Sequence, residues 1–297
     1  MRALMIFLAI LAVAGCAPRP DTGADTIREA SESRTSAQLR PPVLKAPSPP
    51  SATDHSHRSP APSAPVIRPR PELPLAYHRI MSQGVGLSLV CFDDRQYQLR
   101  VADQPAGPGS KWMTAKSAAS THNGVAAING GFFTPEGKPL GLLRENGTKR
   151  GHLNHSSLGA GIYISSTSGS AIIRRESYPT SPIAAGAEQL LQTGPMLVEH
   201  GKAVTGLSAD KNRPRSFILW DGGHHWAIGY ADSCSLAALA SALSQSNVRG
   251  FKVIMALNLD GGRSSDLWVG PQVRGGNQTQ RSFLNKPVRN YLVLTAR

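Results

Sequence analysis

Residues 253–265 read VIMALNLDGGRSS and give the clearest indication of how this chain folds. The apolar run at 253–257 predicts a buried strand that leads into Asp260 and the pair Gly261 and Gly262. A strand that ends in a carboxylate and two glycines brings an acid to a sheet edge, on backbone that can turn sharply. A plain β-turn of the Asp-Gly type explains the same residues. The stretch therefore predicts a strand-end corner, and it leaves open whether that corner is a functional site.

Charge divides the chain into two parts. Residues 17–76 carry eight basic and six acidic side chains, whereas residues 77–297 carry 23 basic and 13 acidic ones. The second part therefore has a positive field, which favours phosphate esters, acidic glycans or anionic lipid head groups as partners. Ordinary solvation of a protein surface explains such charges as well. Because no basic run is interleaved with aromatic residues, no nucleic acid is expected as a partner.

The first 16 residues are expected to be an export signal. A short positive start precedes an apolar run at 3–13, which is too short to span a bilayer as a stable helix. Small residues directly before Cys16 resemble the lipobox of bacterial lipoproteins, which implies cleavage there and a membrane anchor of several acyl chains on Cys16. Ala17 then implies an outer-membrane lipoprotein on the periplasmic or surface face. An ordinary signal peptide with an incidental cysteine is the alternative.

Residues 17–76 are expected to form a disordered tether. They hold 13 of the 23 prolines, together with Ser, Ala and scattered charges. Such a sequence buries too little apolar surface to offset the entropy of ordering, and proline keeps it extended. We therefore expect a spacer that holds a single folded domain, residues 77–297, away from the membrane.

The folded part predicts many short strands and few helices. Alternating or apolar runs predict strand pairs at 84–92 with 97–101, 161–164 with 171–175, and 216–220 with 226–230. Further strands are predicted at 125–128, 196–198 and 291–294, and helices at 112–122, 184–191 and 236–243. Strands and helices do not alternate, which argues against a doubly wound sheet. The predicted fold class is α+β, with a mixed, mostly antiparallel β-sheet and a few flanking helices.

Cysteine and histidine give no sign of a metal site. Cys-x-x-Cys and His-Glu-x-x-His spacings are missing, so a zinc site is not expected and no cofactor is implied. A divalent ion bound among the carboxylates stays open. Cys91 and Cys234 form an even pair that an oxidising compartment would allow to bridge, and two separate buried thiols are the alternative. His152 and His155 lie on a loop, where they either line a pocket or face solvent.

Four separated stretches and one asparagine share a pattern of polar residues near glycines and strand ends. NGGFF at 129–133 has the form of the DGG corner, TGP occupies 193–195, RPRS occupies 213–216, and Asn290 precedes the last strand. In this order the motifs resemble the phosphodiester glycosidase family over roughly residues 80–297. An animal member of that family acts on N-acetylglucosamine-1-phosphodiesters, and its bacterial relatives are exported proteins often linked to exopolysaccharide synthesis.

The resemblance implies that the glycine corners line a common sugar pocket. It also implies that Lys286 stands where the family often has an arginine. A lysine cannot make the bidentate contact with phosphate that an arginine makes. The residues expected to bind substrate are Gly130, Gly131, Thr193, Gly194, Gly261, Gly262, Arg263, Ser264 and Asn290. The residues expected to be catalytic are Asn129, Arg215 and Asp260.

The bond broken in such a substrate joins an anomeric carbon to phosphate. A phosphate monoester has its last pKa near ~6, so it leaves with little help from a general acid. Catalysis then depends on holding negative charge, which suits Arg215 and Arg263, and on stabilising or attacking an oxocarbenium-like centre. Asp260 suits that second task as nucleophile, as base or as orienter of a hydroxyl. The second-choice carboxylates, which simple solvation explains as well, are Glu136, Glu145, Asp210 and Asp266.

The sequence therefore predicts an exported, lipid-anchored glycosidase that acts on a sugar-1-phosphodiester or related bond of an envelope glycan. A glycosidase for a glycan without phosphodiesters is one alternative. A second is a non-catalytic polysaccharide-binding or assembly lipoprotein, and a third is a surface adhesin for anionic polymers. Since likeness of fold does not settle activity, these alternatives remain open at this point.

Overall fold

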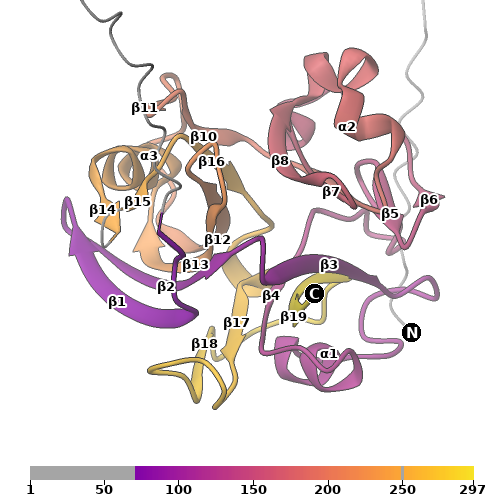
Figure 1. The fold of residues 1–297 in the computed structure, drawn as a ribbon, viewed down its shortest axis with the longest axis horizontal. Helices are drawn as coiled ribbons and strands as arrows, with labels where there is room; N and C mark the ends of the chain where they lie inside the picture. The colour runs from indigo at the N-terminus through magenta and orange to yellow at the C-terminus, as the bar shows by residue number, and fades with distance from the viewer. Residues whose placement is uncertain (1–70, 249–250) are drawn as a thin grey trace, which may run out of the picture. The chain divides into compact units, whose positions relative to one another are not determined.

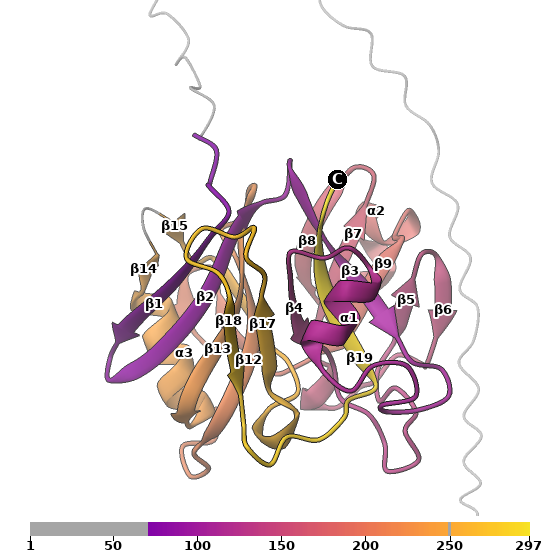
Figure 2. The same ribbon diagram turned by 90° about the horizontal axis from the view of Figure 1, so that it is seen from below.

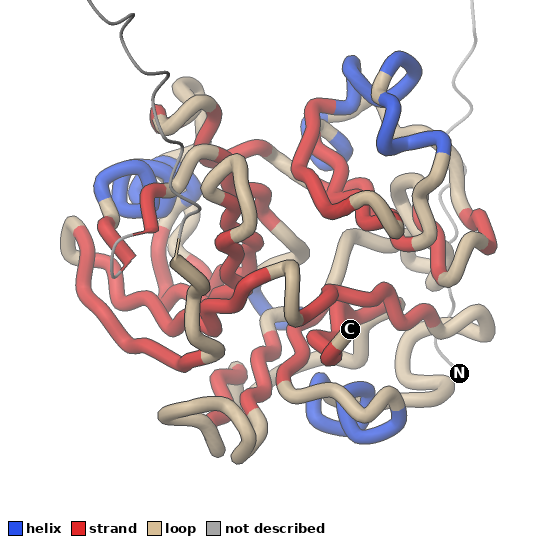
Figure 3. The backbone as a smooth tube through the Cα atoms, viewed as in Figure 1, coloured by secondary structure: helices blue, strands red, loops and turns tan. Residues whose placement is uncertain are grey.

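The computed structural model describes residues 71–248 and 251–297, and antiparallel strands dominate them (Figure 3). The predicted export signal with Cys16, and the tether up to residue 70, lie outside the described residues. None of the described helices is long and apolar enough to cross a membrane. Regular structure begins at Ala76, one residue before the predicted start of the domain.

A seven-stranded antiparallel sheet forms the first layer (Figure 1). In spatial order its strands are β1 (Ala76–Ser82), β2 (Val85–Asp93), β13 (His225–Cys234), β12 (Arg213–Trp220), β16 (Met255–Asn258), β10 (Met196–Glu199) and β11 (Lys202–Ala203). Helix α3 (Leu236–Gln245) packs on this sheet, and the Ser235 hydroxyl caps it by accepting a hydrogen bond from the Ala238 N–H at 3.1 Å. Near the sheet, β14 (Asn247–Val248) and β15 (Phe251–Lys252) form a small ribbon.

A five-stranded sheet carries the first and the last of the family motifs, because Asn129 ends one of its strands and Asn290 begins another. Its strands are β18 (Gln278–Arg281), β17 (Asp266–Val269), β4 (Ala126–Asn129), β19 (Asn290–Ala296) and β3 (Tyr97–Asp103). Helix α1 (Ala115–Thr121) packs against β4, β17 and β19 (Figure 2). It starts later than the predicted helix at 112–122, because Thr114 and Ser117 form a capping box that fixes its first turn.

The third sheet also has five strands and lies beside short helical turns. Its strands are β6 (Thr148–Arg150), β5 (Leu143–Glu145), β9 (Gln189–Thr193), β7 (Gly161–Ser166) and β8 (Gly169–Arg174). The helical turns beside it are α2 (Pro182–Ala185), η1 (Ser157–Gly159) and η2 (Arg175–Thr180). A further turn, η3 (Gly262–Ser264), lies in the DGGRSS segment and contacts β12 of the first sheet.

Tyr163 shows how the three sheets share one core. It lies on β7 in the third sheet, and its ring packs edge-on against Trp226 of the first sheet, with ring centroids 5.8 Å apart. Its hydroxyl donates a hydrogen bond at 2.8 Å to the carbonyl of Leu99, on β3 of the second sheet. Each sheet thus buries apolar side chains against the others, and their strand ends are held in fixed relation.

The predicted fold class is confirmed, but two local predictions are wrong. The strand at 84–92 does not pair with that at 97–101, because β2 pairs with β1 and β13 whereas β3 pairs with β19. The predicted helix at 184–191 ends at Ala185, and β9 takes up its second half. The hairpins β7–β8 and β12–β13 are confirmed.

The two cysteines of the described domain remain separate thiols, so a disulfide between them is excluded. In the register of the sheet, Cys91 lies opposite Ala227, and Cys234 lies seven residues further along the same strand. Seven residues of strand extend for roughly 20 Å, whereas a disulfide needs Cα atoms within about 7 Å. Burial raises the pKa of the Cys234 thiol to about 11, which keeps it unreactive.

Candidate active site

The corners after β4 and after β16 meet at one place. The Asp260 N–H donates a hydrogen bond to the carbonyl of Gly130 at 3.0 Å. In return, Nδ2 of Asn129 donates to the carbonyl of Asp260 at 2.6 Å. The two glycine-flanked corners that the sequence predicts to be related are therefore joined directly, although they are more than a hundred residues apart in the chain.

Asn129 lies behind this junction, with 0% of its surface exposed. Its Oδ1 accepts hydrogen bonds from the Ser216 hydroxyl at 2.6 Å and from the Asp266 N–H at 3.1 Å. With its Nδ2 also engaged, the amide is held entirely by other protein groups. The side chain holds three strand ends together and lines neither cavity described below.

Asn290 fixes the NGG corner from the neighbouring strand. Its Oδ1 accepts a hydrogen bond from the Gly131 N–H at 2.8 Å, and its carbonyl accepts one from the Gly130 N–H at 2.8 Å. A Cβ atom on Gly130 would lie 2.0 Å from the Asn290 Oδ1, so only glycine fits at that position. Asn290 and both glycines are therefore placed to shape the corner from within the protein.

The TGP motif joins the same cluster from β9. The Thr193 hydroxyl donates to the carbonyl of Asn258 at 3.1 Å, and Nδ2 of Asn258 donates to the carbonyl of Gly194 at 2.8 Å. The peptide bond between Gly194 and Pro195 is cis. Thr193 is completely buried, so the motif supports the end of β16 from behind.

Two cavities open on the front of this cluster, and Arg213 and Gly261 line both. The inner cavity has a volume of about 150 Å³ and is lined by Phe132, Leu158, Pro195, Arg213, Arg215, Leu236, Asn258, Asp260 and Gly261. The outer cavity has a volume of about 480 Å³ and is lined by Pro108, Phe133, Arg213, Gly261, Arg263, Ser264, Lys286 and Pro287. Asp260 is the single carboxylate among these lining residues.

The ionisation of Asp260 is adjusted by its surroundings. Burial raises the pKa of this carboxyl to about 6, while hydrogen bonds from the Ser264 hydroxyl and the Gly261 N–H favour the charged form. Gly262 follows with φ of +65°, a left-handed conformation that suits glycine and starts the turn carrying Ser264. A carboxyl group with a pKa near 6 can gain and lose a proton under ordinary conditions, as catalytic acids and bases do.

Arg215 is a buried cation without a carboxylate partner. Only 9% of its surface is exposed, and none of the ion pairs within 71–248 and 251–297 involves it. Its Nε donates to the carbonyl of Cys234 at 3.1 Å and its Nη2 to that of Lys211 at 2.6 Å, while Nη1 lies near Gly261. Burial lowers its pKa, and the charge of Arg213 acts in the same direction. A buried, uncompensated guanidinium favours the binding of an anion.

Three further cations line the outer cavity, namely Arg213, Arg263 and Lys286. In the part of the chain that the structure describes, none of the three forms an ion pair with a carboxylate. Of these three residues, the sequence motifs point to Arg263 as a binding residue. Arg213 precedes Arg215 by two residues, and the period of a strand places such residues on one face, so this spacing was a usable signal. Lys286 comes from a distant loop, and the sequence points to it only through the family resemblance, in which an arginine often stands at this position.

The structure thus separates the predicted site residues into two groups. Those that line a cavity are Arg215, Asp260, Gly261, Arg263 and Ser264. Those that lie near the cluster without lining either cavity are Asn129, Gly130, Gly131, Thr193, Gly194, Gly262 and Asn290. The second-choice carboxylates Glu136, Glu145, Asp210 and Asp266, and the loop histidines His152 and His155, line neither cavity.

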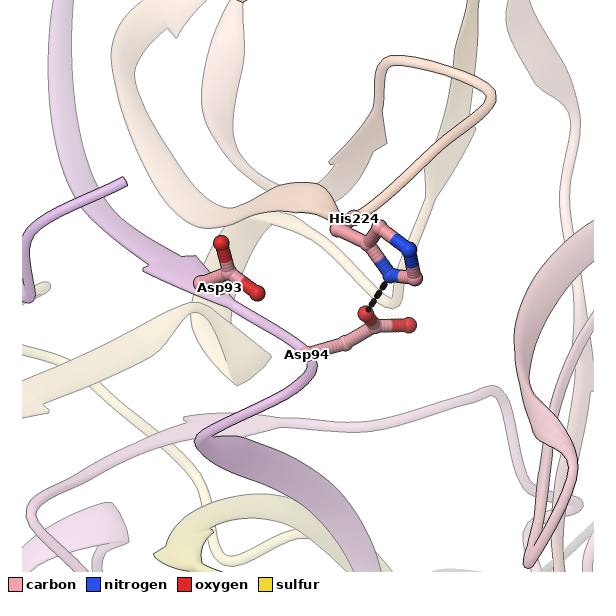
Figure 4. A group of neighbouring side chains, drawn as sticks. All are labelled: Asp93, Asp94 and His224. Atoms are coloured by element: carbon pink, nitrogen blue, oxygen red, sulfur yellow. Dashed lines mark hydrogen bonds and ion pairs between the residues drawn. The ribbon is translucent and has the colours of Figure 1, made fainter. Parts of the chain in front are cut away.

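One group of possible metal ligands occurs among the described residues, at the far end of β2. Ligand atoms of Asp93, Asp94 and His224 lie within 4.8 Å of one another (Figure 4). Arg95 already holds Asp93 through two hydrogen bonds, of 2.9 and 2.6 Å, and Nδ1 of His224 lies 2.7 Å from Asp94 Oδ1. Because Arg95 and His224 already contact the two carboxylates, these carboxylates do not require a metal ion as a partner.

The sequence matches a known protein family, and the fold matches solved structures. A family model described as phosphodiester glycosidase matches residues 122–295, whereas no curated protein matches the chain. The crystal structure of a hypothetical protein from Synechocystis has a similar fold, with a TM-score of 0.55, 17% identity and coverage of 74% of this chain and 61% of that chain. The chain thus spans about 61% of the length of that relative.

A second solved structure with the same fold comes from zebrafish. It is the catalytic domain of N-acetylglucosamine-1-phosphodiester alpha-N-acetylglucosaminidase, auto-inhibited by its pro-peptide. The TM-score is 0.53, the identity 16%, and the match covers 74% of this chain and 82% of that chain. At such identities these two structures establish the fold, while the family model covers more than half of the sequence. The chain therefore belongs to the phosphodiester glycosidase family.

Proposed function

We propose that this protein hydrolyses a sugar-1-phosphodiester of an envelope glycan, with Asp260 acting at the anomeric centre. The family is one of glycosidases, so hydrolysis is its reaction class. The observation that supports the finer proposal is charge: one carboxyl group and four cations without carboxylate partners among the described residues line two adjoining cavities. That arrangement suits a substrate whose sugar lies near Asp260 and whose phosphate lies among the cations.

A single carboxylate is enough for this chemistry. A glycosidase that expels an alcohol needs a second carboxyl group to protonate the leaving oxygen. A phosphate monoester leaves as a stable anion, because its last pKa is near ~6. Arg215 and the outer cations stabilise the charge that develops on phosphate, and ionised Asp260 attacks the anomeric carbon or activates the water that does so. Direct attack retains the anomeric configuration and water activation inverts it, so the anomer first released identifies the role of Asp260.

The proposal is tested with the purified full-length chain on sugar-1-phosphodiesters and on isolated envelope glycans. Wild type is expected to release reducing ends, and Asp260→Ala to lose activity by roughly a thousandfold or more while melting cooperatively. Glu188→Gln, at an exposed position that lines neither cavity, is the matched control and keeps full activity. If the Asp260→Ala variant folds and hydrolyses the substrate at the wild-type rate, Asp260 is not catalytic. Retention of glycan without release of reducing ends supports a binding module instead.

Arg215→Lys tests the binding of phosphate. Lysine keeps the charge but loses the planar fork that matches phosphate oxygens. We expect kcat/KM for a sugar-1-phosphodiester to fall by about tenfold to a hundredfold, and that for an uncharged aryl glycoside to change little. Arg79→Lys, on the exposed side of β1, is the control. An equal loss on both substrates contradicts a role at the phosphate.

Export and lipid attachment at Cys16 belong to the same proposal and rest on the sequence of residues 1–16. Lipidation would hold the enzyme at the outer membrane, close to envelope glycans. Mass spectrometry of the mature protein is expected to find a chain that starts at Cys16 and carries acyl groups. A mature chain with an unmodified N-terminus elsewhere, or release of the native protein into the soluble fraction, contradicts the anchor.

A further inference from the structure

The rim of the outer cavity carries an exposed apolar tip. Phe283 is the most exposed of the large apolar side chains in the described chain, at 101%, and Leu284 beside it is exposed at 62%. Both belong to the loop between β18 and β19, which also contributes Lys286 and Pro287 to the cavity wall. A single exposed apolar residue is ordinary, but two neighbours on the edge of a charged cavity need an explanation.

The protein holds this tip in place. The Nε of Arg263 donates to the carbonyl of Leu284 at 2.8 Å, and the Lys286 N–H donates to the carbonyl of Arg263 at 2.8 Å. Nδ2 of Asn285 donates to the carbonyl of Ser265 at 2.9 Å. Three hydrogen bonds thus attach the loop to the DGGRSS segment, so the apolar tip keeps a fixed position relative to Asp260.

The outer cavity itself combines cations with apolar walls. Its cations are Arg213, Arg263 and Lys286, its apolar side chains are Pro108, Phe133 and Pro287, and no acidic side chain lines it. Beside Pro287, Met113 is 56% exposed, and both residues lie against Gly109. A ligand in the outer cavity therefore meets positive charge and apolar walls together, with exposed apolar side chains nearby.

We propose that the leaving group accepted by the outer cavity is the phosphate ester of a long apolar alcohol, so that the substrate is a lipid-linked sugar-1-phosphodiester. This inference rests on the proposed function and specifies its substrate class. Water supplies the hydroxyl group of the released sugar, the bond from the anomeric carbon to the phosphate oxygen breaks, and the lipid monophosphate departs with the bonding electrons. The cations bind its phosphate, while the apolar walls and the Phe283–Leu284 tip bury the first part of its hydrocarbon chain.

The leaving group can be tested without knowledge of the sugar. Binding of farnesyl monophosphate and of methyl phosphate to the full-length protein is measured by calorimetry below the micellar concentration. We expect farnesyl monophosphate to bind at least about tenfold more tightly, because it alone buries apolar surface. The double variant Phe283→Ser with Leu284→Ser is expected to lose most of that difference and to bind methyl phosphate as before. Met81→Ser, which removes a side chain of 71% exposure on β1, is the matched control and keeps the difference.

A second measurement separates failure of this inference from failure of the proposed function. Two diesters of one sugar, with a methyl or a farnesyl aglycone, are compared as substrates. Hydrolysis of both at equal kcat/KM, with equal binding of the two phosphates, overturns the inference and leaves the hydrolase intact. Preference for the farnesyl compounds that survives in the double variant also overturns the role of the tip. No hydrolysis of either diester overturns the proposed function, while tighter binding of farnesyl monophosphate would still support a lipid-phosphate site.

The tip has one competing use, as a contact with the membrane surface itself. Sedimentation with phosphatidylglycerol vesicles distinguishes the two when both chains also carry Cys16→Ser, so that no acyl anchor binds the vesicles. If the double variant loses vesicle binding while soluble farnesyl and methyl phosphates bind equally well to wild type, the tip faces the bilayer and the inference is wrong. If vesicle binding is unchanged and the soluble preference disappears, the tip belongs to the substrate site.

Discussion

At the residue scale, Asp260 and Arg215 share a cavity without neutralising each other. Burial raises the pKa of the carboxyl group to about 6, and burial also lowers the pKa of the guanidinium. Both shifts show that the fold pays a free-energy cost to keep these groups out of water. Such a cost is common where charged groups are kept ready for a ligand.

Asp260→Asn is therefore expected to stabilise the protein while it removes activity. Folding raises the pKa of this carboxyl above its usual value of 3.8 to about 6, so the ionised group disfavours the folded state at higher pH. At pH 7.5 the free energy of unfolding should rise by about 1–3 kcal/mol. The gain should disappear below about pH 4, where both states hold the proton. Denaturant unfolding of both proteins at pH 7.5 and below pH 4 measures this gain. If Asp260→Asn is less stable than wild type at pH 7.5, burial of the ionised carboxylate does not destabilise the folded state.

The pH dependence of the reaction follows from the same group. In the proposed mechanism Asp260 must be ionised to attack or to act as a base, and burial raises its pKa to about 6. We expect kcat/KM to fall about tenfold for each pH unit below 6 and to level off above it. Phosphodiesters stay ionised throughout this range, so the profile reports on the protein. A flat profile between pH 4.5 and 7.5 would argue against this carboxyl group as the reacting one.

At the element scale, the site exists because strand ends are joined behind it. Asn129 connects β4 with the Asp260 corner, with Ser216 on β12 and with Asp266 on β17. Asn129→Ala leaves these buried partners unpaired, so we expect a loss of about 2–4 kcal/mol in the free energy of unfolding. Chemical denaturation measures this loss. Ser120→Ala, which removes an exposed helical hydroxyl, is the control. If Asn129→Ala changes the free energy of unfolding as little as this control does, Asn129 does not hold the strand ends together.

Local sequence patterns predict part of this arrangement, for definable reasons. The DGG and NGG corners are predictable because each follows an apolar strand directly. Helix α3 is predictable because a residue that can cap it, Ser235, precedes an apolar run. The pairing of 84–92 with 97–101 fails because a polar turn looks the same whether the strands that flank it pair or separate. At 184–191 the sequence of small and apolar residues fits a helix, and only burial of Leu190 and Leu191 within a sheet selects β9.

The candidate site is predictable only where its residues lie within motifs. Arg215 and Asp260 are found in this way. Arg213, Lys286 and the apolar walls depend on long-range packing, since a loop from the end of the chain completes the outer cavity. Local sequence also does not show how deeply a motif residue is buried, and Asn129 and Asn290 are almost fully buried beside the cavities.

At the scale of the whole molecule, the site depends on all three sheets. Its lining comes from segments that stretch from Pro108 to Pro287, and one core around Tyr163 fixes them together. The folded part also carries most of the positive charge, with 23 basic and 13 acidic side chains in residues 77–297. The field of the domain thus favours the approach of anions toward a cavity lined by cations.

Activity should therefore depend on ionic strength in a substrate-specific way. Salt screens exposed charges over a Debye length of about 8 Å at physiological strength. We expect kcat/KM for an anionic phosphodiester to fall about threefold to tenfold between about 20 and 300 mM salt. An uncharged aryl glycoside should show little change and is the control. Equal salt effects on both substrates would mean that the field does not guide binding.

The separation of Cys91 and Cys234 has a practical consequence for how the protein matures. The described domain has no cross-link to form, so its native state does not wait for an oxidant or for an isomerase. Packing of the three sheets stabilises this domain, whereas many small secreted domains depend on disulfide bonds. The described domain should therefore fold under reducing as well as oxidising conditions, and dithiothreitol should leave its melting temperature unchanged.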